Sequence, residues 1–243
     1  MKVIPLALLA VLGANSASAQ DADWAFKATL YGWFPGTSTS VDTRFGTFES
    51  DSSGSDTLSD LDMAFMGTFA AQTGRVSLIT DILYTDLSSS QDTPFALYGE
   101  GSMDVKVSAV SGYALYQVTT DPKIKLDLGV GFRRFDAKLT TSLSAGVLPA
   151  ASEEIDGVWI DPLIAARFNA ALSDDWFLMG FADYGGTGSG DDTWQIYGAV
   201  GYAFNDHWSG QLGYRYMDVS KNLDGRDVSF DLSGPVLALS YEF

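Results

Sequence analysis

The feature that most restricts the fold of this chain is the alternation of side chains over residues 228–243. Leu237, Leu239, Tyr241 and Phe243 share one parity, and smaller or polar residues share the other. A period of two is the signature of a β-strand that has one face in an apolar medium. The sequence also stops on an aromatic residue at the tip of this strand. We therefore expect a sheet whose apolar face is not exposed to water.

Alternating segments of the same kind recur from Trp24 onward, and short turns alternate with longer polar loops. The short turns are expected at 73–75, 120–123, 173–175 and 205–207. An even number of antiparallel strands, with short turns at one rim and long loops at the other, is typical of transmembrane barrels. The pattern predicts an all-β protein: a closed antiparallel transmembrane β-barrel of about ten strands, with eight or twelve also possible, short periplasmic turns and long extracellular loops.

The first nineteen residues have the pattern of a signal peptide. Lys2 precedes an apolar run that is too short to span a membrane as a helix, and small residues at 17–19 fit a cleavage site after Ala19. We expect residues 1–19 to be removed on export and residues 20–243 to form one barrel domain. Residues 41–48 also alternate, which allows an extra hairpin above the membrane.

A soluble ten-stranded sandwich or barrel is the competing fold, because it also needs one apolar face per strand. The tryptophans favour the membrane, since all six lie near expected strand ends and an indole prefers the boundary between lipid and water. The membrane-interface girdle predicted on this basis is Trp24, Trp159, Trp176, Trp194, Trp208 and Phe243.

The parity opposite to the apolar face predicts the residues that line the lumen. Both signs of charge occur there in similar numbers, so we expect them to pair across strands, because an unpaired charge in a narrow lumen is costly. We favour a network of salt bridges that plugs the lumen and only stabilises the barrel over a narrow polar path through the lumen. The predicted charged lining is Lys27, Asp62, Asp81, Lys106, Lys125, Asp127, Arg133, Asp161, Arg167 and Arg215.

Composition restricts the partners. The formal net charge is −17, which argues against nucleic acid, and the absence of cysteine excludes disulfides and thiolate chemistry. The expected partners are membrane lipid, lipopolysaccharide and, through the C-terminal strand, the outer-membrane assembly machinery. Divalent cations could bind loosely at acidic loops such as 49–62, but no dedicated metal site and no cofactor are predicted.

The sequence carries no recognisable catalytic motif. Its one histidine, His207, lies in an expected short turn, on the wrong side for a site among the loops. No G-x-S-x-G motif occurs, and neither Lys-Ser/Thr nor a helix follows the glycine-rich run 185–190. We therefore predict that the protein is not an enzyme.

The chain resembles the small bacterial outer-membrane barrels. The resemblance rests on the alternation, on the rhythm of turns, and on Leu237, Leu239, Tyr241 and Phe243. These barrels include the opacity-type surface proteins, the OmpA barrel domain and the OmpW group. The chain is also similar to barrels of unassigned function that carry segments like 58–67 and 213–218. The resemblance implies a location in the outer membrane of a Gram-negative cell without fixing an activity. A structural or surface-interaction role is our first hypothesis, and a narrow porin-like channel for small solutes or hydrophobic compounds is the alternative.

Overall fold

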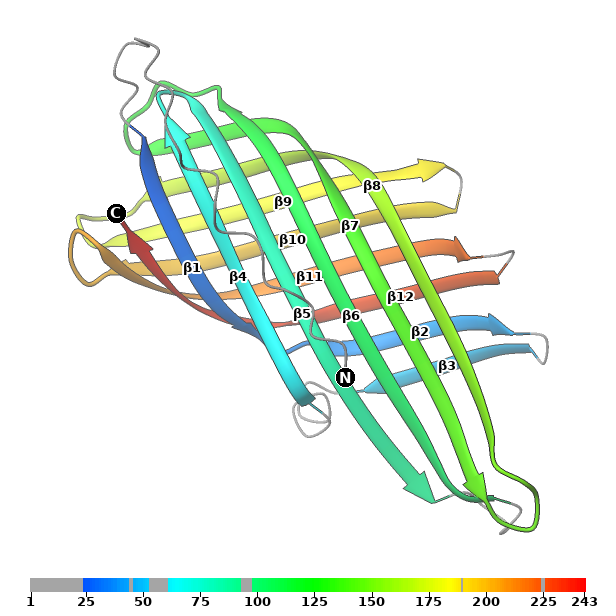
Figure 1. Cartoon of the computed structure of the whole chain (residues 1–243). Helices are drawn as coiled ribbons and strands as arrows, with labels where there is room; N and C mark the ends of the chain where they lie inside the picture. The colour runs from blue at the N-terminus through cyan, green and yellow to red at the C-terminus, as the bar shows by residue number, and fades with distance from the viewer. Residues whose placement is uncertain (1–23, 44–45, 53–60, 93–97, 189, 224–225) are drawn as a thin grey trace, which may run out of the picture.

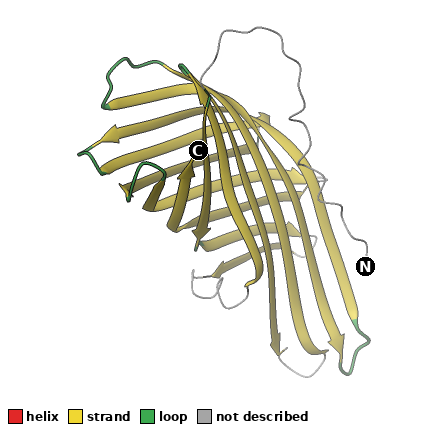
Figure 2. Ribbon diagram, turned by 60° about the vertical axis from the view of Figure 1, so that its left-hand side comes forward, coloured by secondary structure: helices red, strands yellow, loops and turns green. Residues whose placement is uncertain are grey.

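The computed structural model describes residues 24–43, 46–52, 61–92, 98–188, 190–223 and 226–243. The predicted signal peptide, with its cleavage site at Ala19, lies outside these residues. Every regular element among the described residues is a strand (Figures 1 and 2). The strands are β1 (Ala25–Trp33), β2 (Gly36–Thr43), β3 (Gly46–Ser52), β4 (Leu61–Thr73), β5 (Val76–Asp92), β6 (Tyr98–Gln117), β7 (Ile124–Ala145), β8 (Ala151–Ala171), β9 (Trp176–Gly188), β10 (Asp191–Ala203), β11 (Trp208–Leu223) and β12 (Arg226–Glu242).

Ten of these strands form a closed antiparallel barrel, which confirms the predicted fold class. β4 to β12 pair consecutively, and β1 closes the sheet by pairing with both β4 and β12. The register between β1 and the C-terminal strand runs from Lys27 opposite Glu242 to Trp33 opposite Val236. Closure leaves no free edge in this part of the sheet. No helix among the described residues is long and apolar enough to cross a membrane.

The two additional strands form the hairpin that the alternation over 41–48 allowed. β2 continues the line of β1 and pairs with residues 228–233 of β12, and β3 pairs with β2. Between β1 and β2 the backbone lies against Gly234, where an added Cβ would be 2.2 Å from the carbonyl oxygen of Phe34. Only glycine allows this close approach.

Short turns connect the strands at one end of the barrel, the turn side. The extended strand ends, called the strand tips, lie at the opposite end, the loop side (Figure 1). In the tight turn between β4 and β5, Gly74 has a φ of 54°, which favours glycine. At the opposite end, β6, β7 and β8 reach 20, 22 and 21 residues. A membrane crossing needs only about 9–11 residues, so these strands extend well beyond a bilayer (Figure 1).

The prediction of a loop over 140–156 is therefore wrong in its extent. β7 and β8 pair from Ile124 opposite Ala170 to Leu143 opposite Ala151, so only 146–150 connect them. Beyond Phe132 the apolar residues of β7 change parity, because Phe135, Ala137 and Leu139 alternate with polar residues on the parity of Arg133. A search for one continuous apolar face therefore ends this strand too early.

Candidate functional site: the closed lumen

The outer face of the barrel carries a band of exposed apolar side chains. On β7 the exposed residues are Leu128, Val130 and Phe132, and the next outward position is Arg134, which pairs with Asp136. Exposed side chains of this kind continue around the wall on Ile164, Ile196, Leu212 and Leu237. A continuous apolar exterior of this kind is the surface that a membrane covers.

Five of the six predicted girdle residues lie on the outside. Trp24, Trp176, Trp208 and Phe243 are exposed near the turn side, and Trp194 is exposed near the loop side, where its ring lies 4.8 Å from that of Tyr216. Trp159 does not belong to this set. Its side chain is 9% exposed and stacks on Phe135 inside the barrel, with ring centroids 5.1 Å apart. The reason is parity, because the outward positions on this part of β8 are Val158 and Ile160.

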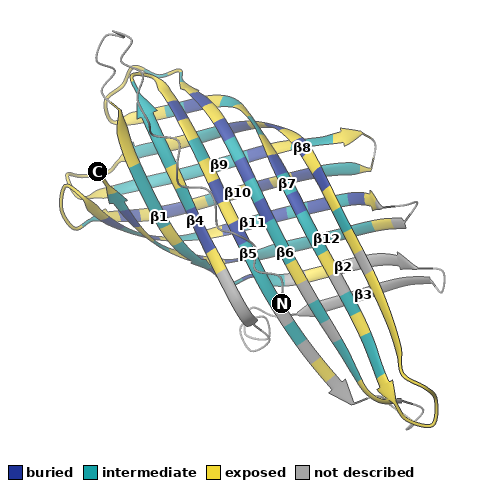
Figure 3. Cartoon of the chain, in the orientation of Figure 1, coloured by how far each residue is buried: buried dark blue, intermediate teal, exposed yellow. Residues whose placement is uncertain are grey.

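Many residues in the middle of the barrel are buried (Figure 3), and those at inward positions include several charged side chains. Arg133 is 0% exposed and donates hydrogen bonds to four side chains: Asp183 (2.6 Å), Ser111 (3.1 Å), Thr193 (3.0 Å) and Tyr113 (3.0 Å). A guanidinium with this many acceptors is fully compensated despite its burial. It joins β6, β7, β9 and β10 across the lumen.

A second arginine continues the same network from the opposite wall. Arg215 donates to Gln195 (2.8 Å), to Tyr31 (3.0 Å) and to Asp81 (3.3 Å). Gln195 in turn donates to Asp183 at 2.5 Å, so the two arginine clusters form one connected network. Hydrogen bonds therefore run from β5 and β1 across the lumen to β6 and β7.

Two further cations, which form three ion pairs, complete the polar layer in the described part of the chain. Arg167 donates to Asp127 (2.8 Å) and to Ser77 (2.9 Å) on the turn side of the network. Lys221 lies on the loop side, 3.3 Å from Asp161 and 3.1 Å from Asp191. The buried charges are thus paired with opposite charges, and no ring of a single sign that would select an ion is formed by them.

An apolar cluster fills the lumen next to this layer. Phe135 (1% exposed), Met217 (2%) and Val219 (1%) are at its centre, and Trp33, Met66, Leu83, Ala109, Trp159 and Val236 surround them. Trp33 also covers the guanidinium of Arg215 at 4.7 Å from its ring centroid. The hydrocarbon cluster and the hydrogen-bonded network together close the interior. A barrel of about ten strands is close to the size that side chains can fill.

Six of the ten predicted lining residues are inside: Asp81, Asp127, Arg133, Asp161, Arg167 and Arg215. Lys27 and Lys125 share the inward parity but lie at the turn-side mouth, where Lys27 pairs with Glu242 at 2.9 Å. The side chain of Asp62 lies outside the described part of the structure.

The prediction for Lys106 is wrong, because its side chain is outside the barrel and pairs with Asp86. On β6 the apolar face, with Ala109, Tyr113 and Leu115, packs inward. Its alternation was therefore assigned to the wrong side.

Sequence reasoning missed several central members of the network. Asp183 is fully buried and accepts from Arg133, Tyr113 and Gln195, yet both faces of β9 are rather apolar, so alternation does not indicate which face points inward. A single carboxylate in an otherwise apolar strand was the available signal. Tyr113 and Gln195 gave no signal, because their role depends on partners from other strands.

The one histidine is structural in its contacts. His207 lies in the turn before β11, where its backbone N–H donates to the side chain of Asn205 (2.9 Å). Its Nδ1 is 2.9 Å from the carbonyl oxygen of Glu242, and its ring stacks on Tyr241. These contacts keep it at the turn end, far along the barrel from the strand tips. In the described residues, no group of three or more histidine, aspartate or glutamate side chains could hold a metal ion.

No protein-family model and no curated protein matches the sequence. Among solved structures, the outer membrane protease OmpT from Escherichia coli is similar over 94% of this chain and 99% of its own, with 11% identity and a TM-score of 0.63. Ail of Yersinia pestis (10% identity, 90% and 98% covered) and the Neisserial surface protein A (14% identity, 90% and 97% covered) have TM-scores of 0.38 and 0.32. At 11% identity the likeness to OmpT concerns the fold alone, which is that of an outer-membrane β-barrel. The expected location in the outer membrane agrees with this fold and with the apolar exterior.

Proposed function

We propose that this protein is a closed, non-enzymatic outer-membrane barrel whose outward sheet extension serves surface interactions or the architecture of the envelope. The observation that carries the proposal is the filled lumen, where Arg133 and Phe135 are at most 1% exposed. A solute path would have to break the connected network of buried ion pairs.

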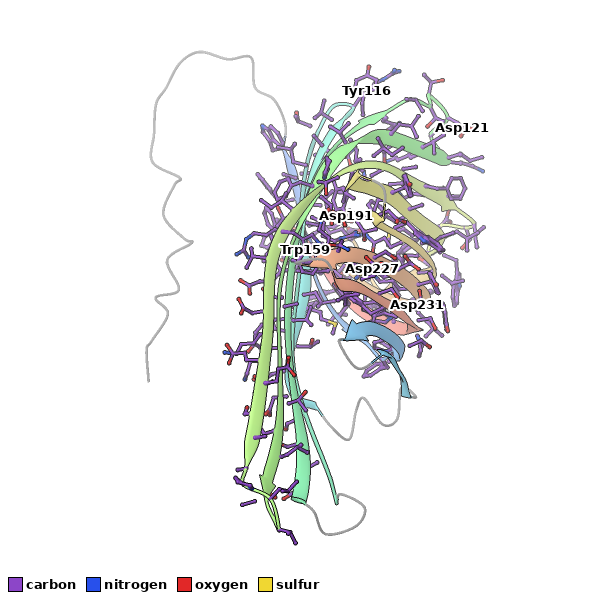
Figure 4. All side chains as sticks on the ribbon, turned by 90° about the vertical axis from the view of Figure 1, so that its right-hand side faces the viewer. Tyr116, Asp121, Trp159, Asp191, Asp227 and Asp231 are labelled. Carbon is purple, nitrogen blue, oxygen red and sulfur yellow. The ribbon has the colours of Figure 1, made fainter. Side chains whose placement is uncertain are left out.

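The extension supplies the surface for such a role. Beyond Phe132, β7 runs for another thirteen residues to Ala145, which at about 3.3 Å per residue is about 40 Å along the strand. Its outward charges are paired, as in Lys138 with Glu154 (2.8 Å). Figure 4 shows that the tips of these strands project from the end opposite to Tyr116 and Asp121. Paired strands present a more regular surface than the long polar loops expected from the sequence.

The narrow channel remains the second candidate, and one observation favours it. The turn-side half of the lumen contains a cavity of about 190 Å³ that reaches the network at Asp81 and Arg215. A channel would therefore need only the network and the apolar cluster to move.

Conductance in planar bilayers separates the two functions. We expect the purified wild-type protein to give no unitary currents. The variant Arg133→Ser/Phe135→Ser/Asp183→Ser, which removes a buried ion pair of the network together with the central ring of the apolar cluster, should conduct and so serves as the positive control. Reproducible unitary currents from the wild type, altered by Thr193→Ala next to Arg133, would establish the channel instead.

Display on cells tests the orientation. An epitope inserted at 146–150, the connection between the longest strands, should be labelled by antibody on intact cells. The same epitope at 119–123 should be labelled only after permeabilisation. The reverse pattern would place the extension in the periplasm and exclude a role at the cell surface.

A further inference from the structure

The cavity in the turn-side half of the lumen has a defined entrance and a defined floor. It begins at Lys27 and Asn169, close to the turn-side ends of β1 and β8, and it ends at Asp81, Gln195 and Arg215. The apolar cluster on the other side of the network separates it from the outward extension. The cavity is therefore accessible from the turn side alone.

The charged side chains that line this cavity are mostly cationic. Lys27, Arg167 and Arg215 line it, whereas Asp81 is the single carboxylate among its lining residues. Asp127, the partner of Arg167, is buried in the lumen outside the lining of the cavity, and Glu242, the partner of Lys27, lies at the rim. Each cation has a carboxylate partner, but among the residues that line the cavity itself the cationic groups outnumber the carboxylates.

The three cationic side chains differ in their exposure and in the number of their hydrogen-bond partners. Arg215 is 7% exposed and is held by Asp81, Gln195 and Tyr31, so it forms part of the floor. Arg167 and Lys27 are 17% and 32% exposed, and each is near the entrance. A ligand anion can reach these two without breaking the buried network.

Between entrance and floor the wall is apolar and aromatic. Ile79, Met179 and Phe181 line it, and Phe181 packs edge-to-face on Tyr113 with centroids 5.1 Å apart. An apolar cavity of about 150 Å³ holds one benzene molecule. A volume of about 190 Å³ therefore fits one ring with a small substituent, or a short alkyl chain, and excludes a large lipid.

We propose that this cavity binds a small organic anion, a carboxylate carried on one aromatic ring or on a short alkyl chain. The carboxylate lies between Lys27 and Arg167, and the apolar body contacts Phe181 and Ile79. The ligand enters from the turn side. This site is independent of the surface role, because the closed part of the lumen lies between the two.

Titration calorimetry of the folded protein in a non-ionic detergent tests this site with benzoate, and benzylamine is the matched cation. We expect benzoate to bind with a stoichiometry of one and benzylamine not to bind. Lys27→Gln should weaken benzoate about two- to fivefold, the range for a partly exposed ion pair. Empty micelles provide the blank.

Filling the cavity distinguishes binding in the lumen from binding elsewhere. Ala238 lines the cavity, so Ala238→Phe should reduce benzoate affinity at least about tenfold by steric exclusion. Ala114→Phe, at an exposed outward position, should leave it unchanged. If Ala238→Phe does not fold, Ala70→Phe fills the same cavity from β4. Equal binding of benzoate and benzylamine, or unchanged binding in a folded cavity-filling variant, would overturn the proposal.

Discussion

Removing the charge of Arg133 should destabilise the barrel more than any exposed charge change. In Arg133→Met the carboxylate of Asp183 keeps the donors of Tyr113 (2.7 Å) and Gln195 (2.5 Å) but loses its only cation at 2.6 Å. Both side chains are 0% exposed, so water cannot replace the lost partner. Breaking a buried pair in this way costs about 3–5 kcal/mol.

A double-mutant cycle tests the physical reason for this loss. Adding Asp183→Asn to Arg133→Met removes the stranded charge, so we expect the double variant to be more stable than Arg133→Met alone. The coupling energy should be about 1–3 kcal/mol. Urea unfolding of the protein in lipid vesicles, followed by tryptophan fluorescence, measures each free energy.

Arg134→Met is the matched control, because this neighbour is 40% exposed and pairs with Asp136 at 3.2 Å on the outer face. Its loss should stay below about 1 kcal/mol. Additive losses in the Arg133–Asp183 cycle, or an equal loss in Arg134→Met, would refute the argument that a compensated buried pair closes the lumen.

Three other predictions test the outer wall, the inner packing and the loop-side rim. Leu212→Arg, at an exposed position of the apolar band, should cost about 2–4 kcal/mol in vesicles, whereas Ser220→Arg on the same face of β11 should cost about 0–1 kcal/mol; equal costs would contradict the position of the membrane. Gly201→Ala places a Cβ 2.1 Å from the ring of Phe177 and should cost about 1–3 kcal/mol. Gly198→Ala on the same strand, with no atom within 4 Å of the added Cβ, is its control, and equal effects would show that the ring moves freely. Asp218 lies on the loop side of the Trp194–Tyr216 pair. Its partial burial and the nearby carboxylate of Asp231 raise its pKa from 3.8 to about 7. Because the folded state favours the protonated acid, the melting temperature should fall as pH rises from about 4 to 7, and Asp218→Asn should reduce this dependence; an unchanged dependence in the variant would assign it to other groups.

The residue pattern by itself determined the class of fold and indicated that lipid surrounds the barrel. Alternation such as that of Leu237, Leu239 and Tyr241 requires one apolar face, and the rhythm of short turns sets the order of antiparallel neighbours. Arg133 and Asp127 alternate with the apolar residues of their strand, which identified them as inward residues, because a charged side chain on the lipid face is costly. These inferences need only the sequence of a single strand and its neighbours.

The tertiary structure decided which face of an ambiguous strand points inward and what each buried charge contacts. Val107, Ala109 and Tyr113 on β6 form an apolar face that packs inside, so alternation alone gave the wrong side for Lys106. In the same way Trp159 fills the lumen, because the interior of this barrel contains hydrocarbon as well as charge. The partners Arg133 and Asp183 are fifty residues apart in the chain. Their contact exists because β7 and β9 lie on either side of β8 and both side chains point into the lumen of the curved sheet, and no local pattern records that proximity.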